Sequence, residues 1–183
     1  MKTKLLAQIF IASESFFFAT LLISYAYFGV YKMHGVASVQ SLDAFKTGIY
    51  SVFLFSSSFT MWQARRNFVK GNVKALRAWL LGTIILGSVF IYGEGSEYIE
   101  LYHKHITISR NIFGSSFFTI TGFHGLHVTL GLIFLLIVLG LVTFGDFEKT
   151  GISTMEGAEI YWHFVDGVWV FVYTIIYLIP HFI

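Results

Sequence analysis

Histidines and carboxylates lie inside long apolar stretches of this 183-residue chain. His124 and His127 are one helical turn apart in a stretch that holds no Asp, Glu, Lys or Arg, and His163 and Asp166 have the same spacing near the C-terminus. Side chains of these types can bind a metal ion or a haem, carry protons, or hydrogen-bond to neighbouring helices. Their spacing is the first means of choosing between these roles.

That spacing favours hydrogen-bonded packing over metal binding. Di-iron helical bundles use Glu-x-x-His pairs, whereas this chain has one His-x-x-His pair and one His-x-x-Asp pair. A haem held by two histidines would leave the carboxylates unexplained. The chain has no cysteine, so thiolate metal sites are excluded. An independent membrane metalloprotein with histidine ligands remains an alternative hypothesis.

Glutamates occur within other apolar stretches as well. Glu14 lies about nine residues into the first stretch, which places it on the order of 14 Å deep, near the centre of a bilayer. Glu94 stands between two glycines, which allow close helix packing, and Glu97 follows one turn later, so we expect both to face the bundle. Glu159 precedes His163 by four residues and can orient that histidine. A proton-active role and a protonated, packing role both stay open for Glu14.

The composition and the apolar segments indicate which elements position these groups. Hydrophobic residues make up 56% of the chain and charged residues 12%, against about a quarter charged in soluble proteins. Glu14 interrupts the first apolar run, which we interpret as a retained span and not a cleaved signal. A bilayer needs about 20 helical residues to be crossed. We predict an all-α membrane protein, a five-transmembrane-helix bundle forming a single transmembrane domain over residues 1–183, with spans at about 5–31, 47–64, 77–101, 112–144 and 158–179.

The distribution of basic residues predicts the orientation of the bundle. Of the 12 Lys and Arg residues, eight fall on the side of the N-terminus and four on the other side, and the segment from Arg65 to Arg77 supplies most of the difference. Cytoplasmic loops of membrane proteins carry an excess of Lys and Arg. We therefore expect the N-terminus in the cytoplasm and the C-terminus outside. The formal net charge of +2 does not point to a nucleic-acid partner.

Four segments of the chain resemble subunit III of the haem-copper terminal oxidases. They are SESFFFATLLISYAYF, GSEYIE, SRNIFGSSFFTITGFHGLHVTLG and YWHFVDGVWVFVY, and they follow the order of the family. The resemblance matches residues of this chain to the family's buried helix glutamate, its Ser-Glu-Tyr glutamate, its paired histidines and its His-Phe-Val-Asp element, which here are Glu14, Glu97, His124 with His127, and His163 with Asp166. Glu94 departs from the family, which has a more neutral run there.

The resemblance implies a non-catalytic accessory subunit of a cytochrome c or quinol oxidase, without cofactors of its own. Its direct partner would be the catalytic subunit I, which holds haem and copper, reduces oxygen and pumps protons, and subunit II and membrane lipids would be further partners. The chain would support the stability and the proton uptake of subunit I in the plasma (inner) membrane of a bacterium.

The resemblance also has departures and rivals. Longer members have two additional N-terminal helices, and five-span members resemble the quinol oxidase form. No basic residue occurs at positions 140–144, where longer members often carry one, so a lipid-headgroup site is not expected from that segment. A subunit of a nitric oxide reductase complex and a small proton conductor remain alternative functions.

Overall fold

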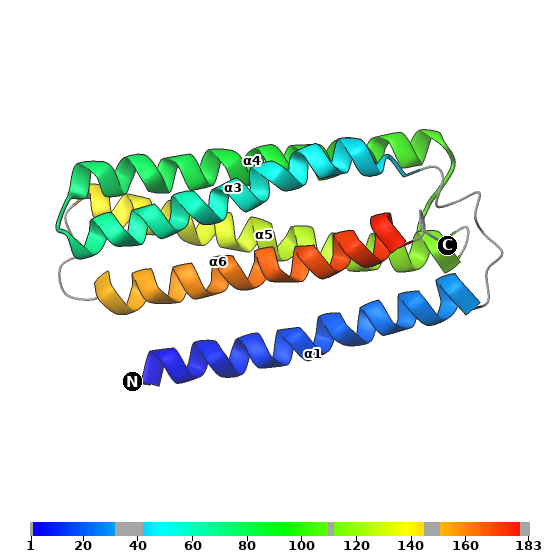
Figure 1. Ribbon diagram of the computed structural model, residues 1–183, viewed down its shortest axis with the longest axis horizontal. Coiled ribbons are helices and arrows are strands. Elements are labelled where there is room, and N and C mark those ends of the chain that lie inside the picture. The colour runs from blue at the N-terminus through cyan, green and yellow to red at the C-terminus, as the bar shows by residue number, and fades with distance from the viewer. Residues whose placement is uncertain (1, 32–41, 110–111, 145–150, 180–183) are drawn as a thin grey trace.

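The chain folds into long antiparallel helices that lie side by side (Figure 1). The computed structural model describes residues 2–31, 42–109, 112–144 and 151–179, and within these ranges no strand occurs. The helices are α1 (Lys2–Tyr31), α3 (Ala44–Val69), α4 (Val73–His103), α5 (Ile112–Phe144) and α6 (Gly151–Tyr173), and α6 continues into the short π-helical segment η1 (Thr174–Leu178). The predicted all-α, five-helix fold is confirmed.

The helices extend beyond the apolar segments because polar residues cap them. The Asp43 side chain accepts a hydrogen bond from the Lys46 backbone N–H at 2.9 Å before α3, and Asn72 accepts one from the Ala75 N–H at 3.2 Å before α4. Such caps satisfy amide groups that a helix start leaves unpaired. Gly71, with φ of 70°, makes the tight turn between α3 and α4 in a conformation that favours glycine.

The arrangement of the helices leaves α1 at the edge of the bundle. α3 and α4 pack against each other along their length, α5 packs against α4 and α6, and α1 packs mainly against α5 and α6 (Figure 1). Close approach depends on small residues: a Cβ atom at Gly93 would collide with the Tyr50 ring. The core contains large side chains that are almost fully buried, among them Leu54, Met61, Phe90, Phe117, Trp162 and Trp169.

Four helices are long and apolar enough to cross a membrane, which makes this a multi-pass membrane protein. They are Gln8–Tyr27, Val73–His103, Phe113–Phe144 and Gly151–Leu178. Among the long described helices, α3 falls short of this apolarity, although its 26 residues run alongside α4. Its serines and its basic C-terminal end reduce its apolar content.

Candidate functional site

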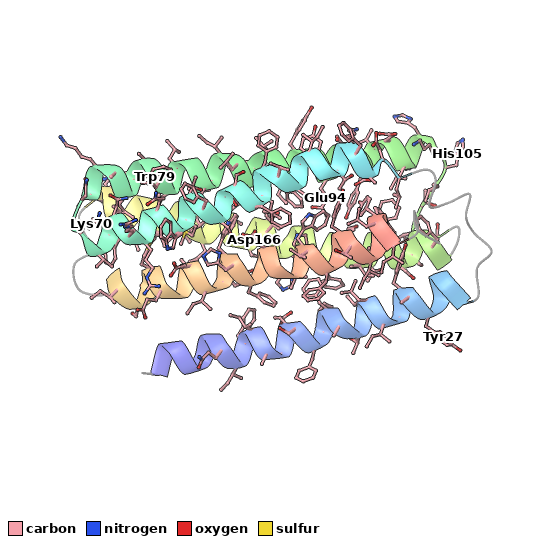
Figure 2. The ribbon with its side chains drawn as sticks, viewed as in Figure 1. Tyr27, Lys70, Trp79, Glu94, His105 and Asp166 are labelled. Atoms are coloured by element: carbon pink, nitrogen blue, oxygen red, sulfur yellow. The ribbon has the colours of Figure 1, made fainter. Side chains whose placement is uncertain are left out.

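The residues predicted from the sequence fall into separate polar contacts on different seams of the bundle. Glu94 and Asp166 lie between Lys70 near one end of the bundle and His105 near the other (Figure 2). Glu94, Glu97, His124, His127 and Asp166 are buried, whereas His163 is exposed on this chain. The contacts of each group show what the arrangement can do chemically.

Glu14 and His127 form a pair that joins α1 to α5. Glu14 Oε2 lies 3.2 Å from His127 Nε2, and His127 Nδ1 lies 2.7 Å from the Phe123 carbonyl oxygen. A carbonyl oxygen only accepts hydrogen bonds, so Nδ1 carries a proton. Nε2 therefore faces the Glu14 carboxyl, and the two groups can share one hydrogen bond between α1 and α5.

The Glu14–His127 pair is also fixed to α6. The Tyr161 hydroxyl donates to the His127 carbonyl oxygen at 2.9 Å, and the Phe18 ring lies edge-on to the imidazole at a centroid distance of 5.2 Å. The Glu14 side chain retains 23% exposure, against 11% for His127. The carboxyl is therefore the member of the pair that is more accessible from outside the chain.

His124 lies in an entirely different environment from His127. Its ring stacks on Trp169 at 4.8 Å and 25°, and it meets the edge of the Phe90 ring at 5.9 Å. The side chain is fully buried, and neither ring nitrogen has a hydrogen-bond partner in the described part of the chain. An imidazolium would be strongly disfavoured there, because nothing offsets its loss of hydration. His124 therefore packs as a neutral aromatic ring.

Glu94 reaches from α4 towards α5. A Cβ atom at Gly125 would lie 2.7 Å from Glu94 Oε2, so the glycine leaves room for this carboxyl. The Tyr98 hydroxyl lies 3.4 Å from Glu94 Oε1 and 2.7 Å from the Thr121 hydroxyl of α5. Glu94 thus faces the bundle and belongs to a hydrogen-bonded contact between two helices.

Glu97 of α4 contacts two other elements, α3 and η1, near the N-terminal end of α3. It accepts hydrogen bonds from the Thr47 hydroxyl of α3 at 3.2 Å and from the Tyr177 hydroxyl of η1 at 2.7 Å. One turn further on, Glu100 pairs with Lys46 at 3.1 Å and with Lys104 at 2.9 Å. The hydrogen bond to Glu100 raises the pKa of Lys46, which lies in the first turn of α3 and outside the apolar segment 47–64.

Ser58 connects the two predicted residues of the His-Phe-Val-Asp element. Its hydroxyl makes a short hydrogen bond to Asp166 Oδ2 and lies 2.9 Å from His163 Nδ1. The second oxygen of Asp166 is buried and has no partner among the described residues. Ser58, Asp166 and His163 therefore form a chain of polar contacts that runs from the interior of the α3–α6 seam to its surface.

Two further serines of α3, Ser51 and Ser57, contribute to its being less apolar than its neighbours. The Trp162 indole N–H donates to the Ser57 hydroxyl at 2.9 Å, and the Trp169 indole N–H donates to the Ser51 hydroxyl at 2.8 Å. Buried indole N–H groups need such partners. The serines thus serve the α3–α6 contact.

Comparison with known proteins gives the family of the chain. The family model described as "Cytochrome c oxidase subunit III" matches residues 2–180. The chain belongs to this family. The cytochrome c oxidase subunit 3 of Synechocystis sp. is 34% identical over 173 residues, which cover 93% of this chain and 73% of that protein. The quinol oxidase subunit 3 of Bacillus subtilis is 31% identical over 178 residues, with 93% and 83% covered. The predicted resemblance to subunit III is thereby confirmed.

The subunit III motifs identified in the sequence all lie within the matched range, but one predicted contact is wrong. Glu159 does not orient His163; its Oε2 atom instead pairs with Arg65 Nη1 at 2.6 Å. Arg65 also lies 3.3 Å from Glu156. The basic end of α3 meets the acidic start of α6 here, and this complementarity of charge was the signal in the sequence that could have predicted the contact.

A second contact of this subunit III chain has no local signal in the sequence. Arg77 of α4 donates to the Val142 carbonyl oxygen at 2.9 Å and lies 3.4 Å from that of Thr143, at the end of α5. A guanidinium there satisfies carbonyls that a helix end leaves unpaired and complements the negative end of its dipole. Residues 140–144 hold no Lys or Arg, and the positive charge at this end of α5 comes from Arg77 of α4.

The described residues contain no group of three or more His, Cys, Asp and Glu side chains placed to hold a metal ion. Their carboxylates and imidazoles contact hydroxyls, backbone carbonyls, basic side chains and aromatic rings. The arrangement can therefore hold helices together, and it places a carboxyl beside an imidazole at Glu14 and His127.

Proposed function

We propose that this chain is the accessory subunit III of a respiratory haem-copper oxidase in a bacterial plasma membrane. The observation that carries the proposal is the match to the subunit III family over residues 2–180, supported by relatives named as cytochrome c oxidase and quinol oxidase subunits. The catalytic subunit I is its direct partner and holds the haem and copper that reduce oxygen, and subunit II completes the core of the complex. The test is whether the chain purifies together with a haem-containing catalytic subunit.

The contacts between the helices support a stabilising role for the chain. Interhelical hydrogen bonds and small-residue packing drive helix association in a bilayer, where apolar side chains gain little by leaving lipid. Glu97, Ser58 and Arg65 each supply such contacts between different elements. The five helices act as one transmembrane domain that gives the catalytic subunit a rigid neighbour.

An apolar groove between α1 and α6 suits the acyl chain of a membrane lipid. It has a volume of about 360 Å³ and is lined mostly by aromatic and aliphatic side chains, including Phe18, Leu22, Phe164 and Phe171.

The start of α1 and the basic turn at Lys70 lie at the same end of the bundle (Figures 1 and 2). We assign this end to the cytoplasm, in accordance with the excess of Lys and Arg there.

The Glu14–His127 pair is the group through which the chain supports proton uptake. Its carboxyl and imidazole lie within hydrogen-bond distance, and the carboxyl is partly exposed on the edge helix α1. His124, by contrast, is fully buried and has no hydrogen-bond partner among the described residues.

Glu14→Gln is expected to leave the complex assembled and to lower the rate of turnover modestly. Glutamine keeps the size of the side chain and its capacity for a hydrogen bond to His127, but it cannot exchange a proton. The measurement is steady-state oxygen consumption of the purified complex together with its subunit ratio. Loss of this chain from the complex would show that Glu14 acts through packing, and an unchanged rate would remove the proton role.

A further inference from the structure

His163 occupies an unusual position for a polar side chain of a membrane protein. It lies 12 residues after Gly151 and 15 before Leu178 in the α6 span, which is about 18 Å and about 22 Å along the helix. The residue is nevertheless exposed on the surface of this chain. A polar ring at mid-depth is costly in contact with lipid, so such residues usually face protein or water.

The contacts of His163 leave one ring nitrogen unused. Ser58 donates its single hydroxyl proton to Asp166, so its oxygen accepts the hydrogen bond from His163 Nδ1–H. The other nitrogen, Nε2, makes no hydrogen bond within the described part of the chain. This tautomer presents Nε2 as a hydrogen-bond acceptor on the exposed surface, and Ser58 and Asp166 hold the ring in place.

Several exposed hydroxyls on the outer faces of the helices do not have this need. Ser13, Ser56, Ser88 and Thr129 each donate back to a carbonyl oxygen of their own helix, at 2.7–2.8 Å. Hydroxyls bonded in this way are satisfied in lipid. An imidazole Nε2 has no such local partner, so His163 needs a donor from outside the chain.

The surface beside His163 differs in composition from the outer face of α5. Phe55 and Trp62 lie three residues before and four residues after Ser58, so they share its side of α3, and they are 39% and 45% exposed. Aromatic residues are enriched in protein interfaces. The middle of the exposed face of α5 is aliphatic, as suits contact with lipid tails, with Leu126, Leu130, Ile133, Leu136 and Ile137, and its exposed aromatic residues are Phe123 and Phe144.

We propose that Phe55, Ser58, Trp62 and His163 form the surface on which this chain docks against a transmembrane helix of the catalytic subunit. This surface is called the α3/α6 patch below. A side chain of that helix donates a hydrogen bond to His163 Nε2, and the aromatic rings of α3 pack around the contact. The inference rests on the proposed function, because it identifies where the oxidase partner binds.

The test compares His163→Leu with a matched control, Leu130→Ala on α5, in the complex purified through a tag on this chain. We expect His163→Leu to lower retention of the catalytic subunit about threefold to tenfold as detergent stringency rises, in keeping with one interhelical hydrogen bond in a membrane. Leu130→Ala should retain it as the wild type does. His163→Gln, which keeps a hydrogen-bonding group, should restore part of the retention.

Photo-cross-linking keeps the test decisive if His163→Leu fails to fold. A photoreactive phenylalanine analogue at Phe55 should cross-link to the catalytic subunit, whereas the same analogue at Ile133 should not. Cross-links from Phe55 to a second copy of this chain or to lipid alone would overturn the proposal. Wild-type retention in His163→Leu would also overturn it. If the wild-type chain itself brings down no catalytic subunit, the proposed function fails instead.

Discussion

Removal of this chain from the purified oxidase is expected to shorten the active life of the enzyme several-fold during turnover, while the initial rate of oxygen reduction falls much less. In the proposed complex the haem and copper belong to the catalytic subunit, so we expect the oxygen chemistry to persist when this chain is removed. Under the proposed function, the catalytic subunit then loses an intramembrane contact surface and the proposed proton role of the Glu14–His127 pair. We expect the lifetime to fall because both losses weaken support for the catalytic subunit during turnover.

The measurement is oxygen consumption over successive turnovers, with the chain removed by detergent and then added back. Recovery of the lifetime on adding back the wild-type chain shows that the loss is specific. Adding back the Glu14→Gln chain separates the two contributions, because a restored lifetime would assign the protection to packing alone. An enzyme that kept both its full rate and its full lifetime without the chain would contradict a supporting role.

Trp169→Ala is expected to have the largest effect of any single substitution on the stability of the chain. The indole is buried, stacks on His124 at 4.8 Å, meets the Phe90 ring at 4.8 Å and donates to Ser51. Replacement of a buried Trp by Ala costs about 3–5 kcal/mol in soluble proteins. We expect about 3 kcal/mol here, because the unfolded chain keeps its side chains in lipid and the loss comes from packing and the cavity.

Unfolding of the purified chain by SDS in mixed micelles, followed by circular dichroism, measures this effect. The control is Phe45→Ala, since the Phe45 side chain is 80% exposed and its loss should change stability by about 0.5 kcal/mol or less. Ser51→Ala should fall between the two, at about 1–3 kcal/mol, because it leaves the indole N–H unpaired. A Trp169→Ala chain as stable as the Phe45→Ala chain would show that the aromatic cluster does not hold the bundle together.

The fold could be predicted from the sequence because each helix is encoded locally. Apolar segments bounded by charge place the helices, and the cap residues Asp43 and Asn72 explain why α3 and α4 begin earlier than their apolar segments. The orientation of the bundle in the membrane and its description as a single domain stay predictions. Contacts between the helices do not depend on which side of the membrane each end of the bundle faces.

The contacts within the candidate site could be predicted only in part. Residue type and depth predicted Glu97 and His127 as buried polar groups, and both are buried, but their partners Tyr177 and Glu14 are 80 and 113 residues away in the chain. The spacing of residues within one helix does not show which side chains of a neighbouring helix will contact them. Glu159 illustrates the error that follows, because a partner on α3 displaced the local pairing.

His124 and His127 show how equal spacing can conceal different roles. Both lie on one side of α5, yet one ring is enclosed by aromatic side chains and the other contacts a carboxyl from α1. The difference arises from the edge position of α1, which places Glu14 next to His127. Tertiary packing, which the motif does not encode, determines which histidine contacts a carboxyl.

The most direct measurement of the proposed function is purification of the complex from its native membrane through a tag on this chain, in a mild detergent. The account predicts a haem-containing catalytic subunit in a fixed ratio to this chain, with oxygen reduction supported by cytochrome c or quinol. Purification of the chain alone, with an intrinsic metal, or with a nitric oxide-reducing enzyme would contradict it.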